Sequence, residues 1–227
     1  MILNTAKNRL IAEIILLFTL QIILIILTSI AAESAGFKGI VPAAAGVVFI
    51  ILPVIILDKT GKPYVRYGLR FTNPLKDILP VLAVALISWS PIVLFIFIFP
   101  HVWGVQDVSW NLKIPDNYIQ IAATHILVVA IPEEFFYRGY LLGRLDDIFT
   151  MRKKIFGTNA GFGLIISSVF FAIGHFAVYA DPARLLVFFP SLLFGWLRYR
   201  QKNISAPVLY HAGSNIFMDL FRAGFGL

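Results

Sequence analysis

The segment from Tyr118 to Leu142 reads YIQIAATHILVVAIPEEFFYRGYLL, and it carries two adjacent glutamates and an arginine inside an otherwise apolar run. A run of this length can cross a bilayer as a helix, which takes about 20 residues. An ionisable side chain at the centre of such a helix costs roughly 2.5–3.5 kcal/mol on insertion scales. The segment therefore predicts a membrane helix that contributes polar groups to a functional site.

The composition of the whole chain fits a protein embedded in lipid. Of its 227 residues, 59% are hydrophobic and only 14% are charged, and the mean hydropathy is +0.85. Soluble domains carry about 25% charged residues, so water is not the expected solvent for most of this surface. Cysteine is absent, which excludes disulfide bonds and thiolate metal sites.

Apolar stretches recur along the chain and predict an all-α fold, a polytopic bundle of about seven transmembrane helices. The sixth and seventh stretches are short, so we expect one of them to be tilted or re-entrant. We divide the chain into N-terminal helices and loops (1–117) and a core (118–221) that holds the polar motifs. The stretches are 10–31, 39–57, 78–99, 118–142, 159–180, 184–199 and 204–221.

The basic residues predict how the helices are oriented. Fourteen of the 19 Lys and Arg residues fall in segments on one side of the predicted membrane, and four fall on the other. The positive-inside rule then places the N-terminus in the cytoplasm. The net charge of +7 comes from short loops between apolar runs, so it indicates membrane topology and no nucleic-acid partner.

The first polar motif places two glutamates in different surroundings. Glu134 and Arg138 are four residues apart and share a helix face, where they can pair. Glu133 points about 100° away and lacks this partner, which makes it the better candidate for a general base. Pro132 frees the carbonyl of Val128, which favours a kink or a water pocket beside Glu133. The alternative is that the Glu134–Arg138 pair only holds helices together. That alternative would not explain the second carboxylate, Glu133.

The second and third motifs add histidines and an amide. Phe171 and His175 share a face of the fifth stretch, and His211 and Asn215 share a face of the seventh. Lys154, near the turn between the fourth and fifth stretches, is equally far in sequence from Glu133 and His175. An antiparallel hairpin of symmetric helices would place those two side chains at the same depth.

Each of these motifs also has a structural reading. A lone histidine on an apolar helix is usually a packed, hydrogen-bonded residue. His211 and Asn215 can bond two membrane helices together, or they can donate to a developing oxyanion. If Ser205 caps the last helix and Pro207 lies in its first turn, His211 is near the membrane surface and shallower than Glu133, unless the helices are bent or extended.

Together, one glutamate, two histidines and one asparagine suit hydrolysis. Glu133 would take a proton from water, His175 would help to hold that water, and His211 and Asn215 would stabilise the oxyanion. Glu133, His175 and His211 are also a donor set that can bind zinc, although the HExxH spacing of zinc proteases is absent. A G-x-S-x-G motif and a pair of intramembrane aspartates are absent as well.

The three motifs, in this order and each in its own apolar stretch, resemble those of the CPBP family, also called the CAAX-protease and bacteriocin-processing or ABI family. The resemblance covers about residues 118–221. A further stretch, Leu185–Pro190 followed by Gly195–Leu197, is similar to prokaryotic members that process the C-terminal sorting tails of exported proteins. The motif residues are Glu133, Glu134, Arg138, Phe171, His175, His211 and Asn215.

The resemblance implies a glutamic-type intramembrane endopeptidase, for which we expect no cofactor, with zinc at Glu133, His175 and His211 as the alternative. It implies that Glu133 and His175 activate water, that His211 and Asn215 form the oxyanion hole, and that Glu134, Arg138 and Phe171 support them. The expected partners are the lipid bilayer and a membrane-anchored protein or peptide substrate, and the expected location is a prokaryotic plasma membrane. The alternative is a non-catalytic immunity or scaffold protein of the same family. A proton-relay transporter would be favoured by inverted repeats, which the sequence lacks.

Overall fold

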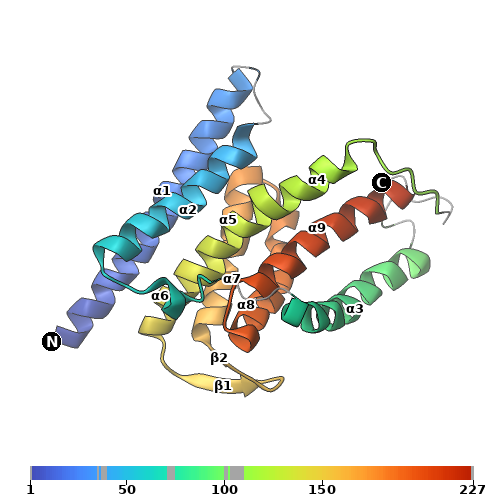
Figure 1. The fold of residues 1–227 in the computed structure, drawn as a ribbon. Coiled ribbons are helices and arrows are strands. Elements are labelled where there is room, and N and C mark those ends of the chain that lie inside the picture. The colour runs from blue at the N-terminus through green and yellow to red at the C-terminus, as the bar shows by residue number, and fades with distance from the viewer. Residues whose placement is uncertain are drawn as a thin grey trace.

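The computed structural model describes residues 2–34, 36, 40–70, 75–99, 102 and 110–225, and this part of the chain is almost wholly helical (Figure 1). The elements are α1 (Ile2–Ser34), α2 (Val41–Lys59), η2 (Tyr64–Tyr67), α3 (Leu75–Ile98), α4 (Tyr118–Thr124), η4 (His125–Ala130), α5 (Ile131–Glu134), η5 (Phe135–Leu141), α6 (Leu142–Ile148), β1 (Arg152–Ile155), β2 (Thr158–Gly161), α7 (Phe162–Tyr179), η6 (Pro182–Val187), α8 (Phe188–Gln201) and α9 (Ser205–Phe225).

Five of the described helices are long and apolar enough to cross a membrane, which agrees with the first five predicted stretches. The stretch predicted at 184–199 is divided between η6 and α8, and the 14 residues of α8 span only about 21 Å. The stretch predicted at 204–221 forms α9, which has the length but is less apolar. The five are Thr5–Ser34, Val41–Lys59, Leu75–Ile98, Tyr118–Ile148 and Phe162–Tyr179.

The fourth membrane helix, residues 118–148, changes its winding around Pro132. The single α-helical turn of α5 lies between two π-helical segments, η4 and η5. Such wide turns inside a helix often occur at functional sites. A Cβ atom at Gly46 of α2 would lie 3.2 Å from both the Pro132 Cγ and the Val128 carbonyl oxygen. Helix α2 therefore packs directly against the break, where the sequence predicted a kink or a water pocket.

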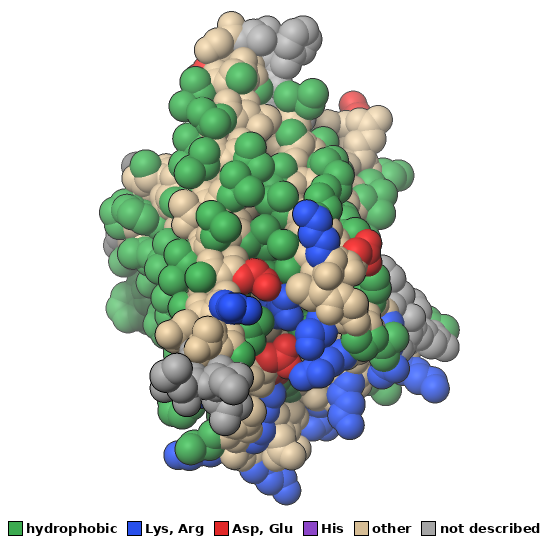
Figure 2. Space-filling view, turned by 90° about the vertical axis from the view of Figure 1, so that its left-hand side faces the viewer, with side chains coloured by type: hydrophobic (Ala, Val, Ile, Leu, Met, Phe, Trp, Pro, Cys, Tyr) green, Lys and Arg blue, Asp and Glu red, His purple; other side chains and the backbone are tan. Residues whose placement is uncertain are grey.

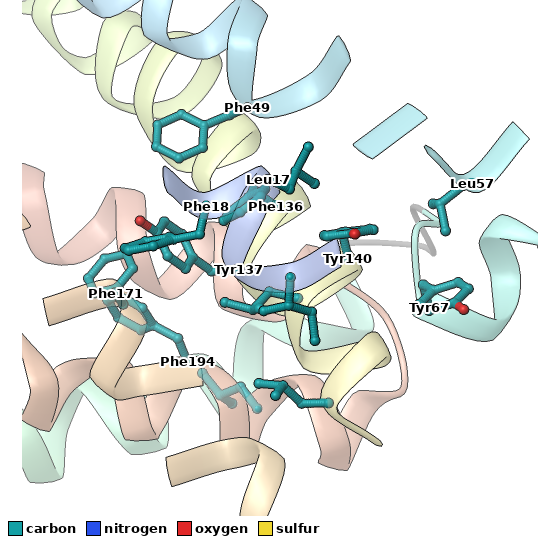
Figure 3. Packing of buried hydrophobic residues seen from close by; sticks show 14 of the residues in the cluster. Leu17, Phe18, Phe49, Leu57, Tyr67, Phe136, Tyr137, Tyr140, Phe171 and Phe194 are labelled. Atoms are coloured by element: carbon teal, nitrogen blue, oxygen red, sulfur yellow. The ribbon is translucent and has the colours of Figure 1, made fainter. Parts of the chain in front are cut away.

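The core of the bundle is aromatic and lies where η5, α7 and α8 meet the α1–α2 pair (Figure 3). Phe136, Tyr137 and Phe171 are each at most 2% exposed. The ring of Tyr137 meets Phe171 edge to face, with centroids 4.9 Å apart, a favourable geometry for aromatic pairs. This packing fixes the inner faces of η5, which carries Arg138 and directly follows the two glutamates of α5, and of α7, which carries the second motif.

An antiparallel hairpin of β1 and β2 joins α6 to α7, in place of the simple turn that the all-α prediction contained. Its two-residue loop, Phe156 and Gly157, has positive φ at both positions, as a tight two-residue hairpin turn requires. The Trp196 indole of α8 donates a hydrogen bond of 3.1 Å to the Ile155 carbonyl. This contact ties the hairpin to α8.

The turn between α8 and α9 is buried within the protein. Asn203 and Ile204 are 2% and 0% exposed, and the Ile204 amide donates to the Gly68 carbonyl at 3.1 Å. The Asn203 side chain caps α9 by accepting from the Ser205 amide at 2.8 Å. The segment around Gly68 covers this turn, so α9 begins inside the protein, and one end of the His211 ring lies 4.0 Å from Glu133.

A charged network joins α1 to the end of the fourth membrane helix. Glu13 accepts two hydrogen bonds from Arg144, at 2.7 and 2.9 Å, and one from the Tyr140 hydroxyl at 2.6 Å. Arg144 is 2% exposed and also reaches Tyr67. The carboxylate of Glu13 thus neutralises an arginine that would otherwise be a costly buried charge.

Glycines allow η2 to pack closely on the fourth membrane helix, and this gives a first prediction. A Cβ atom at Gly143 would lie 2.1 Å from the ring of Tyr67, which is fully buried. We expect Gly143→Ala to lower the free energy of unfolding by about 1–3 kcal/mol, because the ring has no space to retreat into. Thermal unfolding in detergent measures this loss.

The matched control is Gly213→Ala in α9, where the added Cβ would meet only Trp89 at 3.5 Å, an ordinary contact. That variant should unfold at the wild-type temperature or above, since alanine favours helix more than glycine does. Equal unfolding temperatures for both variants would contradict the close packing of η2.

Candidate active site

Glu133 lies on α5 and faces two histidines that come from distant parts of the chain. Its Oε2 atom is 4.0 Å from the Nε2 atom of His175 on α7 and 4.0 Å from the Nε2 atom of His211 on α9. Within the described residues, this buried oxygen has no hydrogen-bond partner. The cluster therefore presents an unpaired carboxylate oxygen to two imidazole nitrogens, as the hairpin geometry predicted for His175.

The hydrogen bond of His175 fixes its tautomer. Its Nδ1 atom lies 3.0 Å from the Phe171 carbonyl oxygen, one helical turn back. Because a carbonyl only accepts, Nδ1 carries the proton and Nε2 of the neutral ring has a lone pair. That lone pair points to the space beside Glu133, where it can accept a hydrogen bond from water.

His211 is oriented by the other glutamate. Its Nδ1 atom lies 2.8 Å from Oε1 of Glu134, and its ring stacks on Phe194 with centroids 4.8 Å apart. Because the carboxylate accepts at Nδ1, the Nε2 atom is a donor only when the ring is an imidazolium. The predicted oxyanion role of His211 therefore depends on Glu134.

Glu134 and Arg138 form the predicted pair, at 3.2 Å, with side chains 0% and 1% exposed. Arg138 also donates to Ser191 of α8, to the hydroxyl at 2.7 Å and the carbonyl at 3.2 Å. Its guanidinium lies over the Phe171 ring at 4.4 Å, a cation–π geometry. Arg138 thus links η5 to α7 and α8, and the Phe171 ring packs against its guanidinium group.

Two supporting contacts had no clear signal in the sequence. Glu134 was predicted to pair only with Arg138, yet it also binds His211, which lies 77 residues further on. Ser191 was not singled out, because a serine in an apolar stretch is common. A fully buried serine that faces an arginine could only be recognised once the helices were placed.

Asn215 follows His211 by one turn of α9 and is half-buried. Among the residues that the structure describes, its amide makes no side-chain hydrogen bond. The structure thus brings Glu133, His175 and His211 into one cluster, whereas Asn215 is linked to them only by its spacing on the helix. Its amide remains free to donate to a group bound beside His211.

The spacing of the cluster distinguishes two possible occupants. A water molecule at about 2.8 Å from each partner fits between atoms that are 4.0 Å apart. Tetrahedral zinc, with bonds of about 2.0–2.2 Å, would place a nitrogen and an oxygen ligand only about 3.4 Å apart. The separation of 4.0 Å accommodates a bridging water, and zinc binding would require the side chains to move closer together.

A second histidine–carboxylate pair lies apart from this cluster. His125 of η4 and Asp219 of α9 are 2.7 Å apart, Nε2 to Oδ2. The pair gives His125 a partner within the helix bundle. The contact fastens α9 to the start of the fourth membrane helix, two helical turns from Glu133.

Comparison with known families supports the resemblance that the motifs carry. Residues 115–217 match the family described as Rce1-like, the type II CAAX prenyl endopeptidases, which are part of the CPBP family. This region, a little under half of the chain, is therefore similar to the type II CAAX prenyl endopeptidases, and the long apolar helices support a multi-pass integral membrane protein. The match includes Glu133, His175, His211 and Asn215. Comparisons with curated proteins and with solved structures found no match.

Proposed function

We propose that this protein is an intramembrane endopeptidase that cuts a peptide bond in or near the membrane anchor or C-terminal tail of a protein substrate. The observation that carries the proposal is the unpaired Oε2 atom of Glu133, which faces Nε2 of His175 and of His211 at 4.0 Å. Leaving a carboxylate oxygen unpaired between two imidazole nitrogens is costly for the fold, and this position favours a role for the atom in chemistry. A general base needs such an atom.

The chemistry follows from the donors and acceptors of the cluster. A water held between Glu133 and His175 can donate one hydrogen to Oε2 and the other to Nε2, which leaves its lone pairs free to attack the carbonyl carbon. As the water attacks, Glu133 takes its proton and later returns it to the leaving amine. The imidazolium of His211, with Asn215 one turn away, donates hydrogen bonds to the oxyanion.

The test compares membranes that contain the wild type with membranes that contain the Glu133→Ala variant. We expect C-terminally anchored proteins to appear as truncated products, by mass spectrometry, only with the wild type. The mass of the product also identifies the cleaved bond. Identical spectra, with both proteins folded and the candidate substrates present, would favour the immunity or scaffold alternative.

Removal of metal gives a separate prediction. Because the separation of 4.0 Å accommodates a bridging water, we expect cleavage to continue after treatment with a strong chelator and dialysis. A zinc metalloprotease with a known dependence serves as the parallel control for complete removal. Loss of cleavage that added zinc restores would instead assign Glu133, His175 and His211 as zinc ligands.

A further inference from the structure

A basic cavity of about 780 Å³ lies at the end of the molecule that carries the β1–β2 hairpin, away from the Glu133 cluster. Figure 2 shows Lys and Arg side chains gathered at this end, below a mainly hydrophobic surface. Asp146 is the carboxylate among the lining residues. The basic residues that line the cavity are Arg66, Arg70, Arg152, Arg198, Arg200 and Lys202.

Only some of these cations are neutralised by the protein. Arg152 pairs with Asp146 at 2.8 Å, and this hydrogen bond raises the pKa of the Arg152 guanidinium. Arg66 pairs with Asp147, outside the cavity lining. The other four cations make no ion pair with a carboxylate in the part of the chain that the structure describes. The cavity therefore holds a large excess of positive charge.

The cations of α8 are held in place by their packing. Gly68, with φ of +66°, lies so close to Arg198 that a Cβ atom there would come within 2.2 Å of its Cζ. The Nε atom of Arg198 is buried and has no partner within the described residues. The guanidinium of Arg200 lies over the Trp196 ring at 5.3 Å. Cations fixed in this way form a ready site for an anion.

In the hairpin loop beside the cavity, an aromatic residue occupies a turn position that disfavours bulky side chains. Phe156 has φ of +46° and is 88% exposed. A two-residue turn of this type prefers Asn-Gly, and a bulky residue in the left-handed region is strained. The next residues, Gly157 to Asn159, line the cavity. Because the Phe156 side chain is almost fully exposed, its ring can contact an apolar partner at the rim of the cationic cavity.

We propose that this cavity binds the phosphate headgroup of an anionic phospholipid, while Phe156 enters the adjoining lipid interface. Inorganic phosphate would supply the same anionic group, but it has no apolar part that could contact the exposed Phe156 ring. The charge distribution predicts that this end of the molecule faces the cytoplasm, where anionic lipids attract basic segments. The site is independent of the proposed proteolysis, because it uses no residue of the Glu133 cluster.

The experiment adds phosphatidylglycerol or phosphatidylcholine to the purified full-length protein in neutral detergent and counts bound lipids by native mass spectrometry. We expect the wild type to retain phosphatidylglycerol in preference to phosphatidylcholine. The double variant Arg200→Gln with Lys202→Gln removes two cavity cations. It should weaken phosphatidylglycerol binding roughly 30-fold, because each basic residue near an anionic lipid strengthens binding about fivefold. Phe156→Asn should weaken it too, although asparagine suits the turn better.

The matched charge control is Lys153→Gln with Lys154→Gln, since both lysines are exposed on β1 and neither lines the cavity. Equal losses in the two double variants would mean attraction by net charge and would overturn the site. Displacement of the lipid by excess inorganic phosphate, together with unchanged binding by Phe156→Asn, would overturn the lipid in favour of a free anion. Equal retention of phosphatidylglycerol and phosphatidylcholine by the wild type would also overturn the proposed anionic-lipid site.

Discussion

Glu133→Gln is expected to lower the rate of cleavage by about 10²–10⁴-fold, because an amide cannot take a proton from the attacking water. The change removes one charge and keeps the shape of the side chain. Since Oε2 has no partner among the described residues, the fold loses no hydrogen bond. We therefore expect the unfolding temperature to remain at the wild-type value or to rise, while the rate constant for cleavage falls.

Two other glutamates serve as controls for this result. Glu33→Gln changes an exposed carboxylate at the end of α1 and should leave cleavage unchanged. Glu134→Gln should lower both cleavage and stability, because Glu134 holds His211 and Arg138. Cleavage by Glu133→Gln within about tenfold of the wild-type rate would remove Glu133 as the general base, given the usual size of that contribution.

The second large effect concerns stability and arises from Arg138. We expect Arg138→Met to lower the free energy of unfolding by about 3–5 kcal/mol, because it leaves Glu134 as a buried charge with its main partner gone. Both side chains of this pair are at most 1% exposed. Thermal unfolding in detergent, followed by circular dichroism, should show a midpoint lower by on the order of 10 °C.

The control for Arg138 is an arginine that pairs at the surface. Arg66 pairs with Asp147 and its side chain is 57% exposed, so Arg66→Met should cost at most about 1 kcal/mol. Adding Glu134→Gln to Arg138→Met removes the unpaired charge and should recover part of the stability. Equal losses for Arg138→Met and Arg66→Met would contradict a structural role for the buried pair.

The sequence by itself determined the features that depend on local geometry. Apolar stretches of sufficient length predicted the membrane helices, because a lipid environment leaves the backbone few other ways to satisfy its hydrogen bonds. The four-residue spacing of Glu134 and Arg138 predicted their pair, which the structure contains. The separation of Glu133 from that pair followed from the same helical period. The predicted orientation of the N-terminus rests on charge alone and remains a prediction.

Only the tertiary structure decided how the distant parts meet. The sequence left open whether His211 reaches Glu133, and it gave no sign that the α8–α9 turn is buried beneath the segment around Gly68. The contact of His211 with Glu134 and that of Arg138 with Ser191 join helices far apart in the chain. Helical period fixes which residues share a face, whereas the packing of side chains decides which faces meet and at what depth.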